Sequence, residues 1–443
     1  MMILQTVIWI WGIACAVALI QGLLLGLNTW EHRRFARRRR QDDRPSPQSC
    51  RVALLAPCKG LDLDLESNLR HLLTQDYANY EVVFIVESED DPALPIISRL
   101  IREESSIAAR IVVAGRADST GQKIHNLTVA VRQLSPQVEI LAFVDSDVCP
   151  APEWLGRLVS RLYRPGSGTV TGYRWFAPSQ ATLANCLLYS INSSIAALLG
   201  TAGQYIVWGG SWAIRKADFD ALKILDRWHG TISDDLVATV AIKAGALPIE
   251  FEPNCMTASP MNYSPREFLR FLRRQHLIGR IYAPAVWYQS LCLLLISSCA
   301  VLTATVLTGV GLLAGAAWTG WPAGFLLAWY GLQIFRGLLR RDLARIYVRH
   351  WTRAMDRAAW FDVFGSPLTL LLNTVVMAGA CFGDRIVWRG IVYDLDRQGR
   401  LTRVLQPAQA APLDRVLRFD GPESARADTR QPTVAHHAGE GTA

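Results

Sequence analysis

Three long stretches of the 443-residue sequence lack any charged residue, namely residues 1–30, 281–335 and 363–383. A helix that crosses a bilayer needs about 20 apolar residues. The first and last stretches are therefore each long enough for one crossing. The middle stretch is long enough for two, with a turn between Gly309 and Pro322. Because 51% of the chain is hydrophobic and its mean hydropathy is +0.17, we predict an integral membrane protein.

No basic residue precedes the first apolar stretch, although a cleaved signal peptide would carry positive charge there. Arginines follow the stretch instead, at Arg33, Arg34, Arg37, Arg38, Arg39 and Arg40. This order favours an uncleaved anchor whose following domain is cytoplasmic. A solvated face or a nucleic-acid patch is the alternative, but arginines beside an apolar helix more often contact anionic lipid headgroups. With a net charge of +8, we expect the partners to be a membrane and anionic substrates, and no nucleic acid.

The sequence also lacks two common motifs. Its nine cysteines include no CxxC pair, so we assign none to a metal or a disulfide, as expected for reduced cytoplasmic thiols. After the first strand-like run, the chain reads Ala56-Pro57-Cys58-Lys59-Gly60 rather than GxGxxG. This departure disfavours an NAD-dependent enzyme.

Strand-like and helix-like segments alternate after residue 50. Strands are predicted at 51–57, 80–86, 109–114 and 139–144, and helices at 65–73, 95–104 and 123–132. This alternation predicts an α/β fold with a mostly parallel sheet. Ligands bind at the carboxyl ends of such strands.

The resulting domain organisation combines this α/β domain with membrane helices at both ends. An anchor at 1–30 precedes a basic juxtamembrane linker at 31–50, a cytoplasmic catalytic domain at 51–280, about three transmembrane helices at 281–383 with a basic cytoplasmic loop near 336–358, and a tail at 384–443. The tail beyond about residue 405 has a disordered composition. A further apolar stretch at 182–208 is interrupted by polar residues, and it is either buried core or a helix at the membrane interface.

Two carboxylates, Asp145 and Asp147, directly follow the fourth predicted strand. Oxygen ligands in this arrangement suit Mg²⁺ or Mn²⁺, which commonly bridge protein carboxylates to a diphosphate. Aspartates also shape turns, and Ser233-Asp234-Asp235 has the pattern of an ordinary helix N-cap. We nevertheless predict a functional role for the first pair, because it stands at the end of a buried strand.

A basic cluster precedes the second apolar stretch and comprises Arg266, Arg270, Arg273, Arg274, His276 and Arg280. Spacings of three and four place most of these arginines near one helix face. They could bind phosphate or membrane headgroups.

The order of these features resembles the inverting GT-A glycosyltransferases of the ceramide glucosyltransferase type, with the hopanoid-associated glycosyltransferases as bacterial relatives. The resemblance extends from about residue 51 to residue 393. Matching residues are Lys59-Gly60, Asn68-Leu69, Asp76-Tyr77, Glu81-Val82, the DDPA at 90–93, the KxxNL at 123–127, Asp145, Gly210-Ser211, Arg215-Lys216, Asp235 and Trp388-Arg389-Gly390.

The resemblance implies roles for several of these residues. Asp90 or Asp91 would hold the uridine and ribose of the donor, and Lys123 would lie near its phosphates. Asp145 with Asp147 would bind the metal and the diphosphate, and Asp235 would be the general base.

Arg270 and Arg273 would occupy the arginine positions of a (Q/R)xxRW motif. The chain departs from the family at Arg274, which replaces the tryptophan, and at Asp147, which some ceramide glucosyltransferases lack.

We therefore expect a membrane enzyme that transfers a sugar, glucose above all, from a UDP-sugar to a lipid hydroxyl such as that of ceramide, with inversion. A polyprenyl-phosphate or polysaccharide glycosyltransferase and a non-catalytic nucleotide-sugar-binding membrane protein are the alternatives. The expected location is the bacterial inner membrane. Helix counting places the tail outside, whereas Arg385, Arg389, Arg397 and Arg400 favour the inside.

Overall fold

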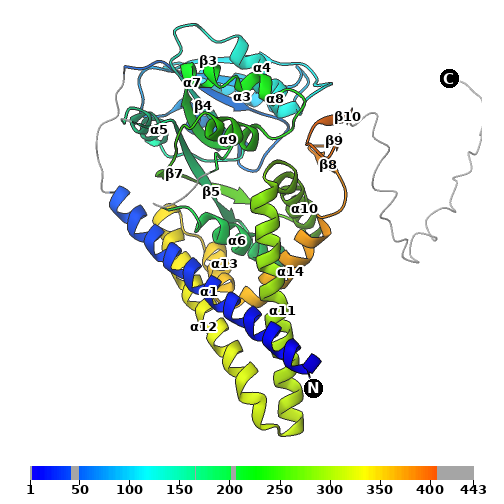
Figure 1. The fold of residues 1–443 in the computed structure, drawn as a ribbon. Helices are drawn as coiled ribbons and strands as arrows, with labels where there is room; N and C mark the ends of the chain where they lie inside the picture. The colour runs from blue at the N-terminus through cyan, green and yellow to red at the C-terminus, as the bar shows by residue number, and fades with distance from the viewer. Residues whose placement is uncertain (1, 41–48, 165, 201–205, 407–443) are drawn as a thin grey trace, which may run out of the picture.

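The computed structural model describes residues 2–40, 49–164, 166–200 and 206–406. An α/β part lies at one end, and long helices form the other (Figure 1). Residues 31–40, the first half of the predicted basic juxtamembrane linker, are helical, because the first helix, α1 (Met2–Arg40), continues through the arginines. Residues 41–48 and the tail beyond 406 lie outside the described residues.

A seven-stranded sheet forms the centre of the α/β part. Its strands are β1 (Val52–Pro57), β2 (Tyr80–Val86), β3 (Ala108–Val113), β4 (Ile140–Val144), β5 (Thr169–Pro178), β6 (Ser211–Arg215) and β7 (Ile249–Met261), in the order β3-β2-β1-β4-β6-β5-β7. The pairs β1–β2, β1–β4, β2–β3 and β5–β7 are parallel. Only β6 runs antiparallel to its neighbours, so the predicted mostly parallel α/β sheet is confirmed.

Helices cover both faces of this sheet. On one face, Leu54 of β1 belongs to the same core as α2 (Leu65–Leu73), α3 (Leu94–Glu103) and α5 (Trp154–Leu162). On the other face, Leu55 packs in a core with α4 (Gln122–Arg132), α7 (Lys216–Ala221), α8 (Ile224–Trp228) and α9 (Asp234–Ala244). Burial on both faces explains why the strands are continuous apolar runs rather than alternating ones.

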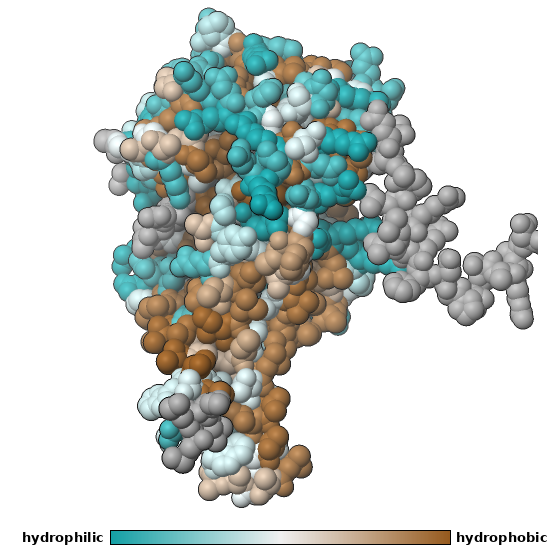
Figure 2. Space-filling model, turned by 45° about the vertical axis from the view of Figure 1, so that its right-hand side comes forward, coloured by the Kyte–Doolittle hydropathy of each residue, from teal (hydrophilic) through white to brown (hydrophobic). Residues whose placement is uncertain are grey.

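The second part consists of α1 and five further helices, among which α11 is long and apolar throughout. They are α10 (Pro265–Tyr282), α11 (Pro284–Ala314), α12 (Gly320–Tyr347), α13 (Arg353–Phe364) and α14 (Ser366–Gly379), with a 3-10 turn η1 (Ala317–Thr319) between α11 and α12. The turn falls within the predicted interval. Apolar side chains dominate the surface of this part (Figure 2).

Among the described residues, two helices are long and apolar enough to cross a membrane, Gln5–Arg40 and Pro284–Ala314. Helices α13 and α14 meet at 84° and could form a broken third span or a re-entrant loop. The number of crossings after residue 280 therefore stays a prediction.

The predicted basic loop near 336–358 is largely helical, which corrects the sequence interpretation. Its arginines are compatible with a helix because they find partners there. Arg340 donates from Nε and Nη2 to Asp362 of α13 at 2.8 and 3.0 Å, and Asp362 also accepts hydrogen bonds from Ser190 and Ser193. Both serines belong to α6 (Leu183–Ala196), most of whose residues are buried. The described part of 182–208 is therefore mainly core.

The chain after α14 forms a second sheet that the sequence did not predict. Its antiparallel strands are β8 (Arg385–Trp388), β9 (Ile391–Leu395) and β10 (Leu401–Leu405), in the order β10-β9-β8. Ile386 and Tyr393 share a buried cluster with Leu277 of α10 and Ile232 of the α/β part. This sheet therefore links the two parts, beside α10 (Figure 1).

Candidate functional site

Four charged side chains meet at the carboxyl edge of the sheet. Asp145 follows β4, and its Oδ1 atom lies 2.7 Å from Nζ of Lys123, near the start of α4. The same Nζ atom lies 3.1 Å from Oδ2 of Asp234, in the first turn of α9. Asp235 is the next residue. The structure thus brings together Lys123, Asp145 and Asp235, which the resemblance singled out.

Burial controls the charges at this centre. Burial alone would lower the pKa of Lys123, but Asp145, Asp234 and Asp235 raise it further than burial lowers it, so the ammonium stays protonated. Asp234 is only 3% exposed. Burial raises its pKa to about 7, against the opposing effect of Lys123. Asp234 was read from the sequence as a capping residue, and only its burial against Lys123 identifies it as part of the site.

The Asp235 carboxylate is held in one orientation by three donors. Its Oδ1 atom accepts hydrogen bonds from the Ser233 hydroxyl at 2.7 Å and from the Leu236 backbone N–H at 2.8 Å, and its Oδ2 atom accepts one from the Gly209 N–H at 3.1 Å. Ser233 is indeed the N-cap of α9, as the sequence pattern allowed. The cap therefore positions a half-buried carboxylate at the edge of the charged centre.

Asp147 lies beside this centre and has unused hydrogen-bonding capacity. Its buried Oδ1 atom has no hydrogen-bond partner among the described residues, and its Oδ2 atom lies 3.9 Å from Nη1 of Arg174. Burial, and then the Asp145 charge, raise the pKa of Asp147 to about 6.

Asp145 and Asp147 fit a divalent cation as oxygen ligands. Within the described ranges no group of three or more His, Cys, Asp or Glu residues is placed to hold a metal. Two carboxylates suffice where a diphosphate supplies further oxygens, as is usual for Mg²⁺.

The structure separates the two candidate aspartates that follow β2. Asp91 is buried, and its Oδ1 atom accepts hydrogen bonds from the Gly60 and Ala93 backbone N–H groups, each at 2.9 Å. It thereby joins the loops after β1 and β2. Asp90 is exposed, so of the two it has the carboxylate that is open to a ligand.

The basic cluster lies on α10, and its members point in different directions. Arg273 donates to the carbonyls of Gly379 and Phe382 at 2.8 and 3.0 Å, which satisfies the end of α14, and Arg270 is exposed. The Arg274 guanidinium is half-buried, with its centre 5.2 Å from the Phe271 ring and 5.3 Å from the Trp388 ring.

Burial lowers the pKa of Arg274 to about 10, although Tyr263 and Asp147 are near enough to raise it. Arg274 thus interacts with Asp147, whereas the Arg273 guanidinium is bound to the carbonyls of Gly379 and Phe382.

Two further residues of the site were given no role in the sequence interpretation. Asp62, just after β1, accepts a hydrogen bond from the Ser146 hydroxyl at 2.7 Å and forms an ion pair with Arg389 of the second sheet. Asp62 could have been found by the strand-end rule, namely that ligands bind at the carboxyl ends of parallel strands. Nothing local in the sequence indicates that Arg389 reaches the site.

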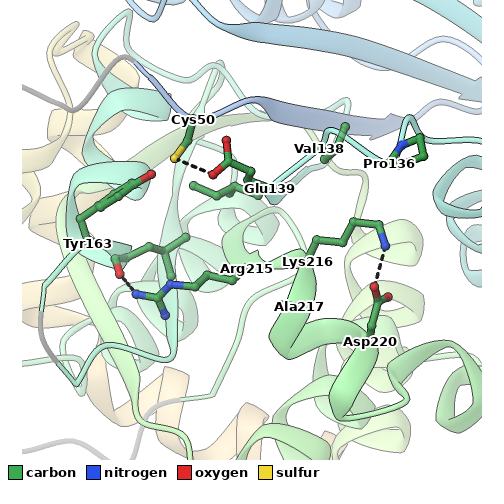
Figure 3. A pocket seen from close by; sticks show the side chains of 11 residues that line it. Cys50, Pro136, Val138, Glu139, Tyr163, Arg215, Lys216, Ala217 and Asp220 are labelled. Carbon is green, nitrogen blue, oxygen red and sulfur yellow. Dashed lines mark hydrogen bonds and ion pairs between the residues drawn. The ribbon is translucent and has the colours of Figure 1, made fainter.

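The pocket drawn in Figure 3 lies elsewhere. Cys50 and Glu139, which precede β1 and β4, line it together with Arg215 at the end of the antiparallel β6. It therefore opens at the amino ends of the parallel strands, opposite the charged centre. Its charged side chains are already paired, as in the 2.5 Å contact of Lys216 with Asp220.

The chain is therefore an α/β protein with a mostly parallel sheet. It has a lysine–carboxylate centre at the carboxyl edge of that sheet, and two helices long and apolar enough to cross a membrane. The family model described as "Glycosyl transferase family 21" matches residues 11–401. The chain belongs to this family, and it is a glycosyltransferase of the ceramide glucosyltransferase-like kind. The resemblance stated from the sequence is thereby confirmed.

Curated relatives match over shorter segments. A ceramide glucosyltransferase of Komagataella phaffii is 34% identical over 122 residues, which is 27% of this chain and 24% of the relative. Ceramide glucosyltransferase 1 of Caenorhabditis elegans is 28% identical over 109 residues, 25% of this chain and 23% of the relative. The chain thus spans about a quarter of the length of these relatives.

Solved structures give more distant similarities. The mannosyltransferase PcManGT from Pyrobaculum calidifontis, in complex with GDP-Man and Mn²⁺, has a TM-score of 0.43 at 17% identity, covering 83% of this chain and 97% of that one. GalNAc-T7 with UDP, GalNAc and Mn²⁺ has a TM-score of 0.36 at 9% identity, covering 52% and 48%. Similarity at this level does not indicate what this chain binds.

Proposed function

We propose that this protein transfers glucose from UDP-glucose, or a sugar from a related UDP-sugar, to the hydroxyl of a membrane lipid such as ceramide, with inversion at the anomeric carbon. The observation that carries the proposal is the centre in which Lys123 is shared by Asp145 and Asp234, with Asp235 adjoining. A positive charge flanked by oriented carboxylates suits both a diphosphate and a hydroxyl that must lose its proton.

In the proposed reaction, Asp235 is the general base. The acceptor oxygen attacks the anomeric carbon as the bond from that carbon to the diphosphate oxygen breaks. The hydroxyl proton passes to the Asp235 carboxylate, whose orientation by Ser233 and Gly209 supports this role. The electron pair of the broken bond leaves with UDP, and Lys123 stabilises the charge that gathers there.

Asp145 and Asp147 would hold Mg²⁺ or Mn²⁺, which offsets the negative charge of the diphosphate. The unpartnered Oδ1 atom of Asp147 supports this assignment. Asp90 or Asp91 would bind the uridine and ribose, with the exposed Asp90 as the preferred residue. Arg270 contributes to donor binding in this scheme, and Arg274 replaces Arg273 as the arginine of α10 that faces the diphosphate.

The lipid acceptor is supported by the short path from the site to the apolar helices. Helix α10 carries Arg274 and leads through Ala283 directly into α11, one of the two helices able to cross a membrane. The α/β part would lie in the cytoplasm, because the arginines at 33–40 follow the apolar part of α1. A bacterial inner membrane is the proposed location.

The test uses purified protein in detergent with labelled UDP-glucose, ceramide or total lipid extract, and Mg²⁺ or Mn²⁺. A single-addition labelled lipid is expected from the wild type, and none from Asp235→Asn or Asp145→Asn. Asp226→Asn removes an exposed aspartate of α8 and should keep full activity. A ladder of products would instead indicate a polymerising enzyme. Failure with several UDP-sugars, despite donor binding, would favour a non-catalytic binding protein.

A further inference from the structure

The hairpin between β8 and β9 has an unusual residue at its tip. Trp388 pairs with Ile391, so Arg389 and Gly390 alone form the turn. Their φ angles are 51° and 79°, both positive, as in the type I′ turn that favours Asn-Gly. An arginine is rarely found in the left-handed region, because its Cβ atom crowds the following carbonyl oxygen there. Strain of this kind at a single position often accompanies function.

The Arg389 side chain points from this tip into the site. Its Nη1 atom donates to the carbonyl of Lys59 at 3.1 Å, and its Nη2 atom donates to Oδ1 of Asp62. The other oxygen of Asp62 accepts the hydroxyl of Ser146, which stands between Asp145 and Asp147. One carboxylate thus links the hairpin tip to the loop that carries the candidate metal ligands.

The hairpin is held firmly on the α/β part. The Gln122 N–H donates to the Tyr393 hydroxyl at 3.2 Å, and Gln122 is the residue before Lys123. Farther along the second sheet, the Leu401 N–H donates to the Gly230 carbonyl at 2.8 Å. The Arg389 backbone is therefore fixed relative to Lys123, which favours a guanidinium placed in advance for a ligand.

We propose that Arg389 binds the diphosphate of the sugar nucleotide, with Asp62 as the residue that positions its guanidinium. A guanidinium has five N–H donors and matches the paired oxygens of a phosphate. Among the described residues, the Arg389 guanidinium donates to two protein oxygens, those of Lys59 and Asp62, so further N–H donors face no protein acceptor in that part of the chain. The second sheet, which follows α14 in the chain, would in this way complete the donor site.

This inference rests on the proposed function, and its test separates the two. The affinities of UDP and of uridine are measured by calorimetry in the presence of Mn²⁺ for the wild type and for Arg389→Asn. Asparagine is preferred at this turn position, so the variant should melt no lower than the wild type. Its UDP affinity should fall about tenfold to a hundredfold, as expected for a lost charge-assisted bond, while its uridine affinity stays unchanged.

A matched control lies in the same hairpin. Arg385 pairs with Asp394 at 2.6 Å and is exposed, so Arg385→Asn removes the same charge away from the site and should bind UDP normally.

Unchanged UDP affinity in Arg389→Asn would overturn the inference even if the wild type transfers glucose. An equal loss of uridine affinity, or a wild type that binds UDP no better than uridine, would also overturn it. A selective loss of UDP affinity in a protein that glucosylates no lipid would support the inference and reject the proposed function.

Discussion

The Nζ atom of Lys123 lies 2.7 Å from Oδ1 of Asp145, and this contact joins the start of α4 to the end of β4. Asp234 of α9 shares the same ammonium. Three elements are therefore held together by one buried cation. Removing one member of a buried ionic group leaves an uncompensated charge. The resulting loss of folding stability is larger than the net stability that the intact group contributes.

The first prediction concerns Lys123→Met. The variant leaves the buried Asp234 and the partly buried Asp145 without their cation, so we expect it to lose about 3–5 kcal/mol of stability, seen as a clear drop in melting temperature in detergent. Adding Asp234→Asn should restore much of the melting temperature without restoring transfer. A single variant that melts like the wild type would show that the cation does not hold these elements together.

The second prediction concerns the pH dependence of stability. Burial raises the pKa of Asp234 from the model-peptide value of 3.8 to about 7, so the folded state binds a proton more tightly than the unfolded state. The stabilising contribution of Asp234 to the free energy of unfolding is therefore fully present below about pH 4 and is lost as the pH rises towards 7. Asp234→Asn should therefore lose less melting temperature than the wild type between pH 5 and pH 8. Parallel curves for the two proteins would contradict this assignment.

Much of the α/β part could be predicted from the sequence. β2 and α2 have the predicted bounds, because strands buried on both faces are continuous apolar runs and α2 has a clear apolar stripe. The strand-end rule located Asp145 and Asp147 for the same reason. The rule did not reveal that Asp234 is buried. The sequence pattern of a helix N-cap is the same whether the first turn of the helix faces solvent or a buried lysine.

Contacts between distant segments could not be predicted in this way. Arg389 meets Asp62 across 327 residues of sequence, and the second sheet consists of short strands in a stretch that reads as a polar tail. The choice between Arg273 and Arg274 depends on a rotation of α10 by one residue. Only the packing of that helix against α14 and Trp388 fixes the rotation.

The third prediction concerns Gly209, which has no side chain where the backbone passes the charged centre. A Cβ atom there would lie 2.8 Å from both Nζ of Lys123 and Oδ2 of Asp234. Gly209→Ala should therefore displace the lysine and lower the transfer rate, while the protein still folds because both neighbours are ends of flexible side chains. Gly324→Ala, at a position with open space around it, is the control. Equal transfer rates in the two variants would show that the lysine position is not critical.

The fourth prediction concerns the buried pair that joins α12 to α13. Arg340 and Asp362 are 3% and 1% exposed. Asp362→Ala leaves the guanidinium without its carboxylate, so a loss of about 3–5 kcal/mol is expected. The double variant Arg340→Met/Asp362→Leu should recover most of the melting temperature, because an apolar pair of similar volume removes both charges. If the double variant is no more stable than the single one, the specific ionic geometry is required.

The last prediction separates the two neighbouring arginines of α10. Arg273 binds the carbonyls of Gly379 and Phe382, so Arg273→Gln should lower the melting temperature and leave the transfer rate of the folded protein unchanged. Arg274 stacks between the Phe271 and Trp388 rings beside Asp147. Arg274→Gln should keep the melting temperature and reduce transfer about tenfold or more, with a weaker UDP affinity. Both variants remove one positive charge from the same helix. Any difference between them therefore reflects where each guanidinium points, and not the net charge of the protein. The opposite pattern, with transfer lost in Arg273→Gln alone, would return the donor site to the arginine that the (Q/R)xxRW spacing predicted.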